Sequence, residues 1–235
     1  MVDGVSSIGR PGAEVIPGVR WGKPEWVPSA AFWAQMSALA HEDDDYVCRD
    51  MTLKEQVGFC LLGGFGITAE MNASAYDRLA AEQIFAPGSL ADAEQIRELL
   101  TAPLEIQGRS RKYRFPNQKA ARLSQALRML EHAPPKTNDH RIFRRELTEI
   151  PGIGMKTASW ITRNWLGSDD VAILDIHIIR AGILIGLFGR DQQVARDYEL
   201  MEGRFLQFAK ALQVRPSLLD AVMWRHMRAL GRGPV

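Results

Sequence analysis

The stretch LTEIPGIGMKTASWITRNWLGSDDVAILDIHIIRAG, residues 147–182, carries the pattern that decides the fold. Near its start, the sequence IPGIG at residues 150–154 is too rich in glycine and proline to continue a helix, and helical spacing flanks it on both sides. We therefore predict two short helices joined by a tight turn, in which Gly152 and Gly154 permit positive φ angles and close approach of a partner. The N–H groups of these glycines, of Ile153 and of the second helix would form a site for an anion such as a phosphate. The pattern alone is equally typical of an ordinary turn.

Lys156 follows the turn and lies in the first turn of the predicted second helix. The helix dipole disfavours a cation at this end of a helix and so favours the neutral amine. A lysine acts as a nucleophile only through its neutral amine. Lys156 is therefore a candidate nucleophile, and the alternative is a solvated lysine that contacts a phosphate.

Asp175 follows the apolar run Val171–Leu174 and has the position of an N-cap before the next predicted helix. The N–H donors and the dipole of that helix stabilise a carboxylate, which could in turn stabilise positive charge on a reacting sugar. His177 and Arg180 follow in the first turns of the helix and are candidate phosphate ligands. The alternative is that Asp175 serves only as the cap and that the other two are surface or packing residues.

Composition excludes several classes of protein. The 235 residues are 46% hydrophobic and 24% charged, with a formal net charge of +1, which is ordinary for a globular protein with a core. No apolar run is long enough to cross a membrane and no signal pattern is present, so we expect a cytoplasmic protein. The two cysteines, Cys48 and Cys60, do not fit a disulfide framework or a metal-ligand spacing. We expect no metal and no organic cofactor.

The rest of the chain is predicted to be all-α, because spacing after residue 28 is helical rather than alternating. Residues 1–28, which are rich in glycine and proline, are predicted to form an extended arm. Thr52, followed by Glu55 three residues later, predicts a capping box at the start of a helix. The predicted helices are residues 31–40, 52–62, 68–83, 90–100, 117–131, 139–149, 156–166, 176–187, 195–213 and 216–230.

A basic cluster lies between Glu105 and Glu131, where seven basic residues occur with no acidic one. Most charge runs are simply solvated surfaces, but in a protein with a net charge of +1 this one is a candidate surface for phosphates. We favour Arg109, Arg111 and Lys112, because they fall in a predicted loop. The remaining basic residues of the cluster are Arg114, Lys119, Arg122 and Arg128.

The hairpin, the lysine and the aspartate together resemble the signature of the endonuclease III and 8-oxoguanine DNA glycosylase superfamily. In that superfamily the hairpin is followed by a loop that ends in a Val-Asp-x-His-like element, which is LDIH at residues 174–177 here. The resemblance is close over the quoted stretch and loose over residues 52–230. It implies a two-lobed helix-hairpin-helix fold with the active site in the cleft between the lobes. Residues 53–168 would form one lobe, and residues 29–52 with 169–235 the other.

The lysine and the cysteine count indicate a branch of the superfamily. Members with a lysine at this position are bifunctional: they remove a base and then cleave the strand by β-elimination. Lys156 and Asp175 are nineteen positions apart, which resembles the 8-oxoguanine enzymes. Endonuclease III-like members usually carry a four-cysteine iron–sulfur cluster, which two cysteines cannot provide. The resemblance therefore favours the 8-oxoguanine branch.

Further residues resemble the base pocket of that branch. Residues 114–120, RFPNQKA, resemble a segment of its shorter bacterial and archaeal members. Asp220 and Trp224 match an aspartate that contacts the extruded base and a tryptophan that stacks on it, and their spacing places both on one helix face. Trp160, one turn after Lys156, could form the other side of a base sandwich. The alternatives are a core tryptophan with a surface aspartate, and core packing for Trp160.

One loop departs from the superfamily. Its members have a polar Ser/Gln/Asn-rich element after the helix that begins near Thr52, and this element fills the gap left by the flipped base. Residues 62–68 of this chain read LGGFGIT instead. Phe65 is a candidate wedge into the base stack, as apolar intercalators are in other proteins. The loop offers no polar group for the partner base, so the opposite-base preference is open.

The resemblance implies a monomer that acts on double-stranded DNA containing a damaged base, with 8-oxoguanine as the expected base, at the nucleoid of a bacterium or archaeon. Asp175 would stabilise an oxocarbenium-like sugar or help to activate the amine, and Lys156 would attack C1′ and displace the base. The resulting Schiff base would allow β-elimination of the 3′ phosphate. Two alternatives remain: a bifunctional glycosylase for another modified base, and a non-catalytic DNA-binding module whose hairpin binds only phosphates.

Overall fold

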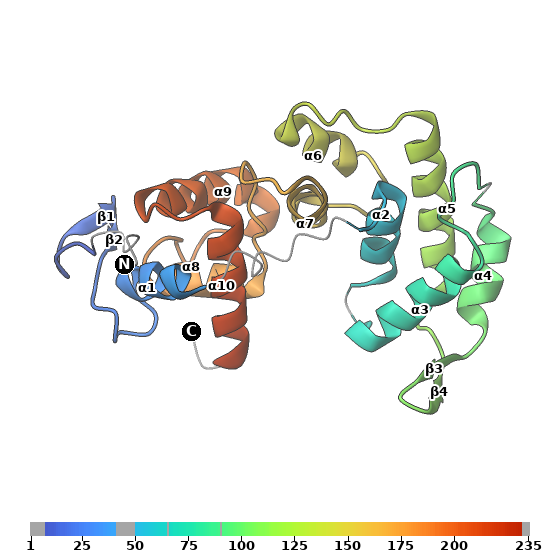
Figure 1. Ribbon diagram of the computed structural model, residues 1–235, viewed down its shortest axis with the longest axis horizontal. Coiled ribbons are helices and arrows are strands. Elements are labelled where there is room, and N and C mark those ends of the chain that lie inside the picture. Colours follow the sequence, from blue (N-terminus) through green and yellow to red (C-terminus); the bar gives the residue numbers. More distant parts are fainter. Residues whose placement is uncertain (1–7, 41–49, 65, 90, 232–235) are drawn as a thin grey trace. The chain divides into compact units, whose positions relative to one another are not determined.

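The computed structural model describes residues 8–40, 50–64, 66–89 and 91–231 (Figure 1). The chain divides into two compact units, one formed by Met1–Val47 with Thr162–Val235 and the other by Cys48–Ile161. The boundary falls inside helix α7 (Met155–Leu166), which gives residues to both units.

The fold is helical, as predicted. In the described part of the chain there are ten α-helices and two short two-stranded hairpins. Each predicted helix is present, with ends within three residues of the predicted ones. None of the described helices is long and apolar enough to span a bilayer.

Helix α5 organises the unit Cys48–Ile161, because it packs against both α2 and α4. Helix α3 in turn contacts α2, α4 and strand β3. The predicted capping box is confirmed at the start of α2, where the Thr52 hydroxyl accepts from the Glu55 N–H and the Glu55 carboxylate accepts from the Thr52 N–H. The elements of this unit are α2 (Leu53–Leu62), α3 (Ala69–Ala81), α4 (Ala93–Thr101), β3 (Leu104–Ile106), β4 (Arg109–Arg111), α5 (Pro116–His132), α6 (His140–Thr148) and the first half of α7.

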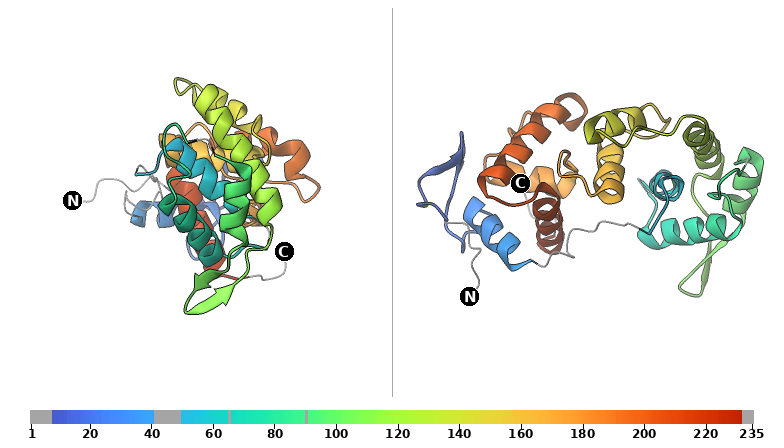
Figure 2. Two further views of the ribbon diagram at one scale, coloured as in Figure 1. Left: turned by 90° about the vertical axis from the view of Figure 1, so that its right-hand side faces the viewer. Right: turned by 45° about the horizontal axis from the view of Figure 1, so that its top comes forward.

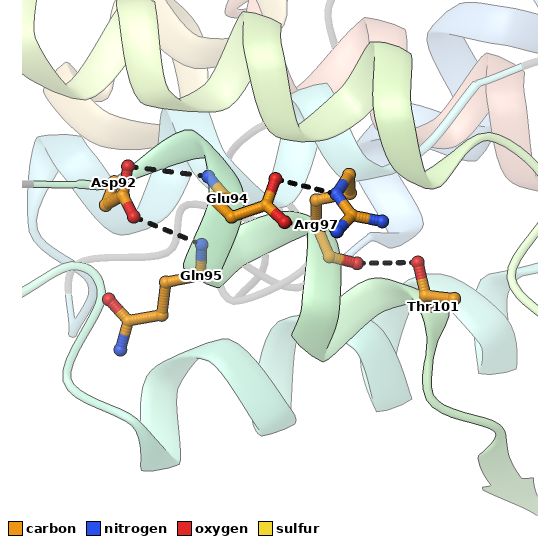
Figure 3. Close-up of polar contacts among 5 residues, drawn as sticks. All are labelled: Asp92, Glu94, Gln95, Arg97 and Thr101. Atoms are coloured by element: carbon orange, nitrogen blue, oxygen red, sulfur yellow. Dashed lines mark hydrogen bonds and ion pairs between the residues drawn. The ribbon is translucent and has the colours of Figure 1, made fainter.

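Helix α4 shows how local polar contacts set the helix ends in this unit (Figure 3). The Asp92 carboxylate caps its start by accepting from the N–H groups of Glu94 and Gln95, each at 3.4 Å. Arg97 Nε donates to Glu94 Oε2 at 2.8 Å, and the Thr101 hydroxyl donates to the Arg97 carbonyl at 2.7 Å. These local bonds fix the ends of α4, and the buried side chains of the helix attach it to the unit.

The segment predicted as a loop from Ile106 to Pro116 begins instead with a β-hairpin, so the prediction that Arg109 and Arg111 lie in a loop was wrong. Strands β3 and β4 pair antiparallel, with Leu104 opposite Arg111 and Ile106 opposite Arg109. Gln107 and Gly108 between them have φ angles of 52° and 71°, the combination that a type I′ hairpin turn requires. The hairpin projects beyond the helices of its unit (Figure 2). The strands were missed because each is only three residues long and β4 is entirely polar.

Helix α10 organises the other unit by packing against α1, α8 and α9. Trp33 and Phe205 are fully buried in this core. The region predicted as an extended arm contains a second hairpin, β1–β2, which contacts α9. Arg204 of α9 donates to the carbonyl of Pro17 in its turn at 3.1 Å. The elements of this unit are β1 (Glu14–Ile16), β2 (Val19–Arg20), α1 (Ala30–Leu39), the second half of α7, α8 (Ile176–Leu184), α9 (Val194–Ala211) and α10 (Pro216–Ala229).

Candidate active site

The predicted helix-turn-helix element is present as α6, a tight turn and α7. The turn is closed by hydrogen bonds from the Ile150 N–H to the Leu147 carbonyl at 3.1 Å and from the Ile153 N–H to the Ile150 carbonyl at 3.0 Å. Both isoleucines are buried, which fixes the turn to the core. Gly152 has a φ angle of 94°, and a methyl group there would lie 3.0 Å from Cδ of Arg122. The turn therefore requires glycine at residue 152 for its conformation and its packing.

Gly154 differs from Gly152, and the expectation of a positive φ at residue 154 was wrong. Its φ angle lies outside the left-handed region, and a methyl group on it would meet no protein atom within 4 Å. The carbonyl of Gly154 accepts from the Ala158 N–H at 2.9 Å, so this residue begins helix α7. Within the described residues, the N–H groups of Gly154, Met155, Lys156 and Thr157 have no hydrogen-bond acceptor. Nothing in the fold of the chain itself explains the glycine at residue 154.

Lys156 extends from this N-terminal turn of α7 and is exposed to solvent. Trp160 follows one turn later and is half-buried. Cys60 of α2 lies near the Lys156 ammonium: burial raises the pKa of its thiol to about 12, and the positive charge of Lys156 partly opposes this rise. The surroundings of Lys156 thus include one protonated thiol.

Asp175 is the N-cap of α8, as predicted. Its Oδ1 accepts from the N–H groups of His177 at 2.8 Å and Ile178 at 2.9 Å. No donor among the described residues reaches Oδ2. One oxygen of this half-buried carboxylate is therefore used by the helix, and the other is available to a substrate.

Asp220 of α10 is buried, with 4% of its surface exposed, so it is not the surface aspartate of the alternative interpretation. Its Oδ2 accepts from the Ile173 N–H at 3.3 Å. The pKa of Asp220 is raised to about 7, mainly by burial and to a lesser extent by the Asp175 carboxylate, while the Arg163 guanidinium opposes the rise. Asp220 and Asp175 are therefore electrostatic neighbours.

Trp224 lies one turn after Asp220 and is half-buried. Its ring meets the His177 ring edge-on, with centroids 6.1 Å apart, and the Arg228 guanidinium lies 5.0 Å from its centroid. The structure thus brings Asp175, His177, Asp220 and Trp224 together in one unit through the contact of α8 with α10. Lys156 and Trp160 belong to the other unit.

The predicted DNA contacts have varied surroundings. Arg109, Arg111 and Lys112 are exposed on and just after β4. Arg180 donates to the carbonyl of Gly231, which gives it a role within the fold. Phe65 lies outside the described residues.

Two other basic residues of the cluster have structural contacts. Lys119 donates to the carbonyls of Leu61 and Gly63 at the end of α2, and burial, with the charge of Arg122, lowers its pKa. Arg122 lies against the hairpin at Gly152. The cluster is therefore partly an internal support of the unit and only partly a free basic surface.

Sequence reasoning missed two residues of this region, Tyr198 and Glu202. They lie one turn apart on α9, and both contact the backbone of the run that precedes Asp175. Their four-residue spacing was visible in the sequence, but nothing in it indicated which backbone they would meet.

Curated proteins with similar sequences are 8-oxoguanine DNA glycosylase/AP lyases. The chain is 34% identical over 143 residues to the 8-oxoguanine DNA glycosylase/AP lyase of Saccharolobus solfataricus, which covers 57% of this chain and 65% of that protein. It is also 34% identical over 118 residues to that of Metallosphaera sedula, covering 48% of this chain and 57% of the relative. The chain therefore spans less than two thirds of the length of these curated relatives.

Solved structures show the same fold. The 8-oxoguanine DNA glycosylase of Methanocaldococcus jannaschii has a TM-score of 0.62 at 21% identity, covering 88% of this chain and 98% of that one. The 8-oxoguanine DNA glycosylase of Thermotoga maritima has a TM-score of 0.55 at 25% identity, covering 74% and 78%. An endonuclease III in a trapped covalent intermediate with DNA has a TM-score of 0.60 at 18% identity, covering 88% and 86%.

Together, the hairpin, the helical architecture and these neighbours define a helix-hairpin-helix DNA glycosylase fold, which confirms the predicted fold class. Within that class, residues 47–214 match the 8-oxoguanine DNA glycosylase family, and the chain belongs to this family.

Replacement of Asp220 by asparagine should change how stability depends on pH. In the folded protein Asp220 keeps its proton up to about pH 7, whereas an unfolded aspartate loses it near pH 4. Protonated Asp220 therefore stabilises the native state at low pH. This stabilisation decreases as pH rises through the window and is lost above the folded pKa. Asparagine does not titrate, so the melting temperature of the wild type minus that of Asp220→Asn should increase as pH falls from about 8 to 5.

The matched control is Glu199→Gln, which removes an exposed carboxylate of the same unit. Its melting temperature should follow the wild type across this pH range. A constant difference between the wild type and Asp220→Asn would contradict the raised pKa of Asp220.

Proposed function

We propose that this protein removes an oxidised purine, 8-oxoguanine in the first place, from double-stranded DNA and then cleaves the abasic strand. The observation that carries the proposal is Lys156, which extends from the first turn of the hairpin's second helix in a chain of the 8-oxoguanine DNA glycosylase family. The curated relatives are named as both glycosylase and AP lyase, which supports a reaction with both steps.

In the proposed reaction, the neutral amine of Lys156 attacks C1′ of the damaged nucleotide. A C–N bond forms as the glycosidic bond breaks, and the base leaves with the bonding electron pair and takes up a proton. The sugar ring then opens to a Schiff base, which acidifies the C2′ hydrogen. Loss of that proton expels the 3′ phosphate by β-elimination. The amine is available for attack because Lys156 is exposed and no carboxylate among the described residues forms an ion pair with it.

Asp175 supplies the negative charge in this proposal. Its Oδ1 is held by two N–H groups of α8, and its Oδ2 has no donor among the described residues. A fixed carboxylate of this kind stabilises the positive charge that develops on the sugar as the base leaves. The reaction requires Lys156 and Asp175 to act on the same nucleotide.

Trp160, Asp220 and Trp224 are the proposed base pocket. The rings of the two tryptophans supply stacking surfaces, and both are half-buried rather than sealed in the core. Asp220 has one carboxyl oxygen on the Ile173 N–H and the other available for the edge of the base. Arg228 lies over the Trp224 ring, so a base that stacks on that face must displace the guanidinium.

The hairpin is the proposed main contact with the DNA backbone. The free N–H groups of the turn and of the α7 N-terminus point a partial positive charge outward, and anions bind such helix ends. Gly152 and Ile153 shape the turn, Gly154 leaves room for a close approach, and His177 is a further proposed phosphate ligand at the start of α8. Arg109, Arg111 and Lys112 would contact phosphates away from the lesion.

The test of the proposal is borohydride trapping on duplexes that contain 8-oxoguanine. Wild-type protein should become cross-linked to the DNA, and Lys156→Gln should lose the cross-link because glutamine forms no Schiff base. Lys210→Gln, which removes an exposed lysine of α9, should trap as the wild type does. Trapping that survives Lys156→Gln would overturn the assignment of the nucleophile. Efficient duplex binding without any cleavage by the wild type would favour the non-catalytic module.

Gly154→Ala should separate DNA binding from folding. Its unfolding free energy should stay within about 0.5 kcal/mol of the wild type, because the residue has an ordinary φ angle and open space around it. Duplex affinity should fall by about tenfold if a phosphate approaches the backbone there. Gly152→Ala should instead lower the unfolding free energy by about 1–2 kcal/mol, since residue 152 has a positive φ. Unchanged affinity in Gly154→Ala would exclude close phosphate contact at residue 154.

The double variant Arg109→Gln/Arg111→Gln should make duplex binding less dependent on salt. Each lost phosphate contact reduces the slope of log affinity against log salt concentration by about 1. Arg97→Gln is the matched control, because Arg97 is a partly exposed arginine of the same unit that is already paired with Glu94. An unchanged slope in the double variant would place the β3–β4 hairpin away from the DNA.

A further inference from the structure

Three consecutive backbone N–H groups ahead of Asp175 are each bound by a different side chain. The Ala172 N–H donates to Glu202 Oε1 at 2.9 Å, and the Ile173 N–H donates to Asp220 Oδ2 at 3.3 Å. The Leu174 N–H donates to the Tyr198 hydroxyl at 3.4 Å. The run that leads to the proposed catalytic carboxylate is therefore held by hydrogen bonds to side chains of α9 and α10.

Tyr198 contacts this run twice. Its hydroxyl accepts from the Leu174 N–H and donates to the Ala172 carbonyl at 2.8 Å. A phenol has one donor and can also accept, so both bonds can exist together. Removing this one oxygen would release two points of the backbone at once.

Residues 171–174 are buried and belong to no helix or strand, and no strand pairs with them among the described residues. A buried N–H group without an acceptor destabilises the folded state, so the run needs acceptors from elsewhere. Tyr198, Glu202 and Asp220 supply them while being buried themselves, with 4–5% of their surface exposed.

Neutral acceptors would be enough to satisfy these N–H groups, but the acceptors present are not all neutral in type. Two of the three acceptors are carboxyl groups, which, unlike a neutral acceptor such as an amide, cost additional free energy when they ionise in a buried place. One of these carboxyl groups, Asp220, interacts electrostatically with Asp175. The two carboxyl acceptors, Glu202 and Asp220, thus bind the backbone directly before Asp175, and that backbone continues into the N-cap of α8.

We propose that Tyr198, Glu202 and Asp220 form a backbone clamp that positions Asp175 for base removal. Tyr198 and Glu202 act through Asp175 and not through contact with DNA, while Asp220 joins the clamp through Oδ2. The clamp fixes the segment on one side of Asp175, and the Oδ1 bonds to α8 fix the other side. This inference rests on the proposed function, since it assumes that Asp175 acts in the chemical step.

The experiment compares Tyr198→Phe with the wild type in single-turnover base removal and in duplex binding. The variant loses only the clamp hydroxyl, so the rate of base removal should fall by about tenfold while the dissociation constant for the damaged duplex changes by less than about twofold. Phe208→Leu is the structural control, because it creates a small defect in the buried core of the same helix. It should lower the melting temperature and leave the single-turnover rate within about twofold.

A double-mutant cycle with Asp175→Asn tests whether Tyr198 acts through Asp175. Asparagine keeps an oxygen for the cap bonds and removes the charge. In this background, adding Tyr198→Phe should change the residual rate by less than about twofold, because the group being positioned no longer contributes. A tenfold loss in both backgrounds would show that Tyr198 acts independently of Asp175 and would overturn the clamp.

Glu202 gives a rescue test of the same clamp. Glu202→Gln keeps an oxygen acceptor for the Ala172 N–H and should retain most of the rate, whereas Glu202→Leu should lose about as much as Tyr198→Phe. Equal rates for glutamine and leucine would exclude the acceptor role. If the wild type itself neither removes the base nor traps, the proposed function fails. If the wild type is active and Tyr198→Phe is equally fast, only the clamp fails.

Discussion

The turn from Ile150 to Gly154 is the constraint on which the site depends. It reverses the chain between α6 and α7 while keeping Ile150 and Ile153 buried, and this leaves the next N–H groups without acceptors in the described structure. Only a residue with a positive φ fits at Gly152. The same turn fixes where α7 begins, and Lys156 therefore extends from the end of a helix where an anion is attracted and an amine is exposed.

The run before Asp175 obeys a different constraint. The turn between α6 and α7 is held by its own backbone hydrogen bonds, whereas residues 172–174 are held by side chains that come from α9 and α10. Such a segment has a defined position only when both helices are in place. The position of Asp175, the proposed catalytic carboxylate, thus depends on the packing of its whole unit, while the turn between α6 and α7 depends on a few local contacts.

This difference explains what the sequence could predict. The hairpin, the Thr52 capping box and the Asp175 cap are local patterns of residue type and spacing, and each is present in the structure. The β3–β4 hairpin was missed because Arg109–Arg111 has no apolar alternation. Tyr198 and Glu202 were missed because their partners are backbone groups 24 to 30 positions earlier in the chain. The positive φ expected at Gly154 was wrong because a helix, and not a left-handed turn, begins there.

The two glycines of the turn differ in whether the fold itself needs them. Gly152 is needed by the protein, since a side chain there would be strained and crowded. Gly154 has an ordinary conformation and open space, so the fold itself would accept an alanine. A glycine that the fold does not need points to a partner that approaches the backbone closely. The phosphate of a DNA strand meets that description, since free N–H groups and a helix N-terminus lie at the same place.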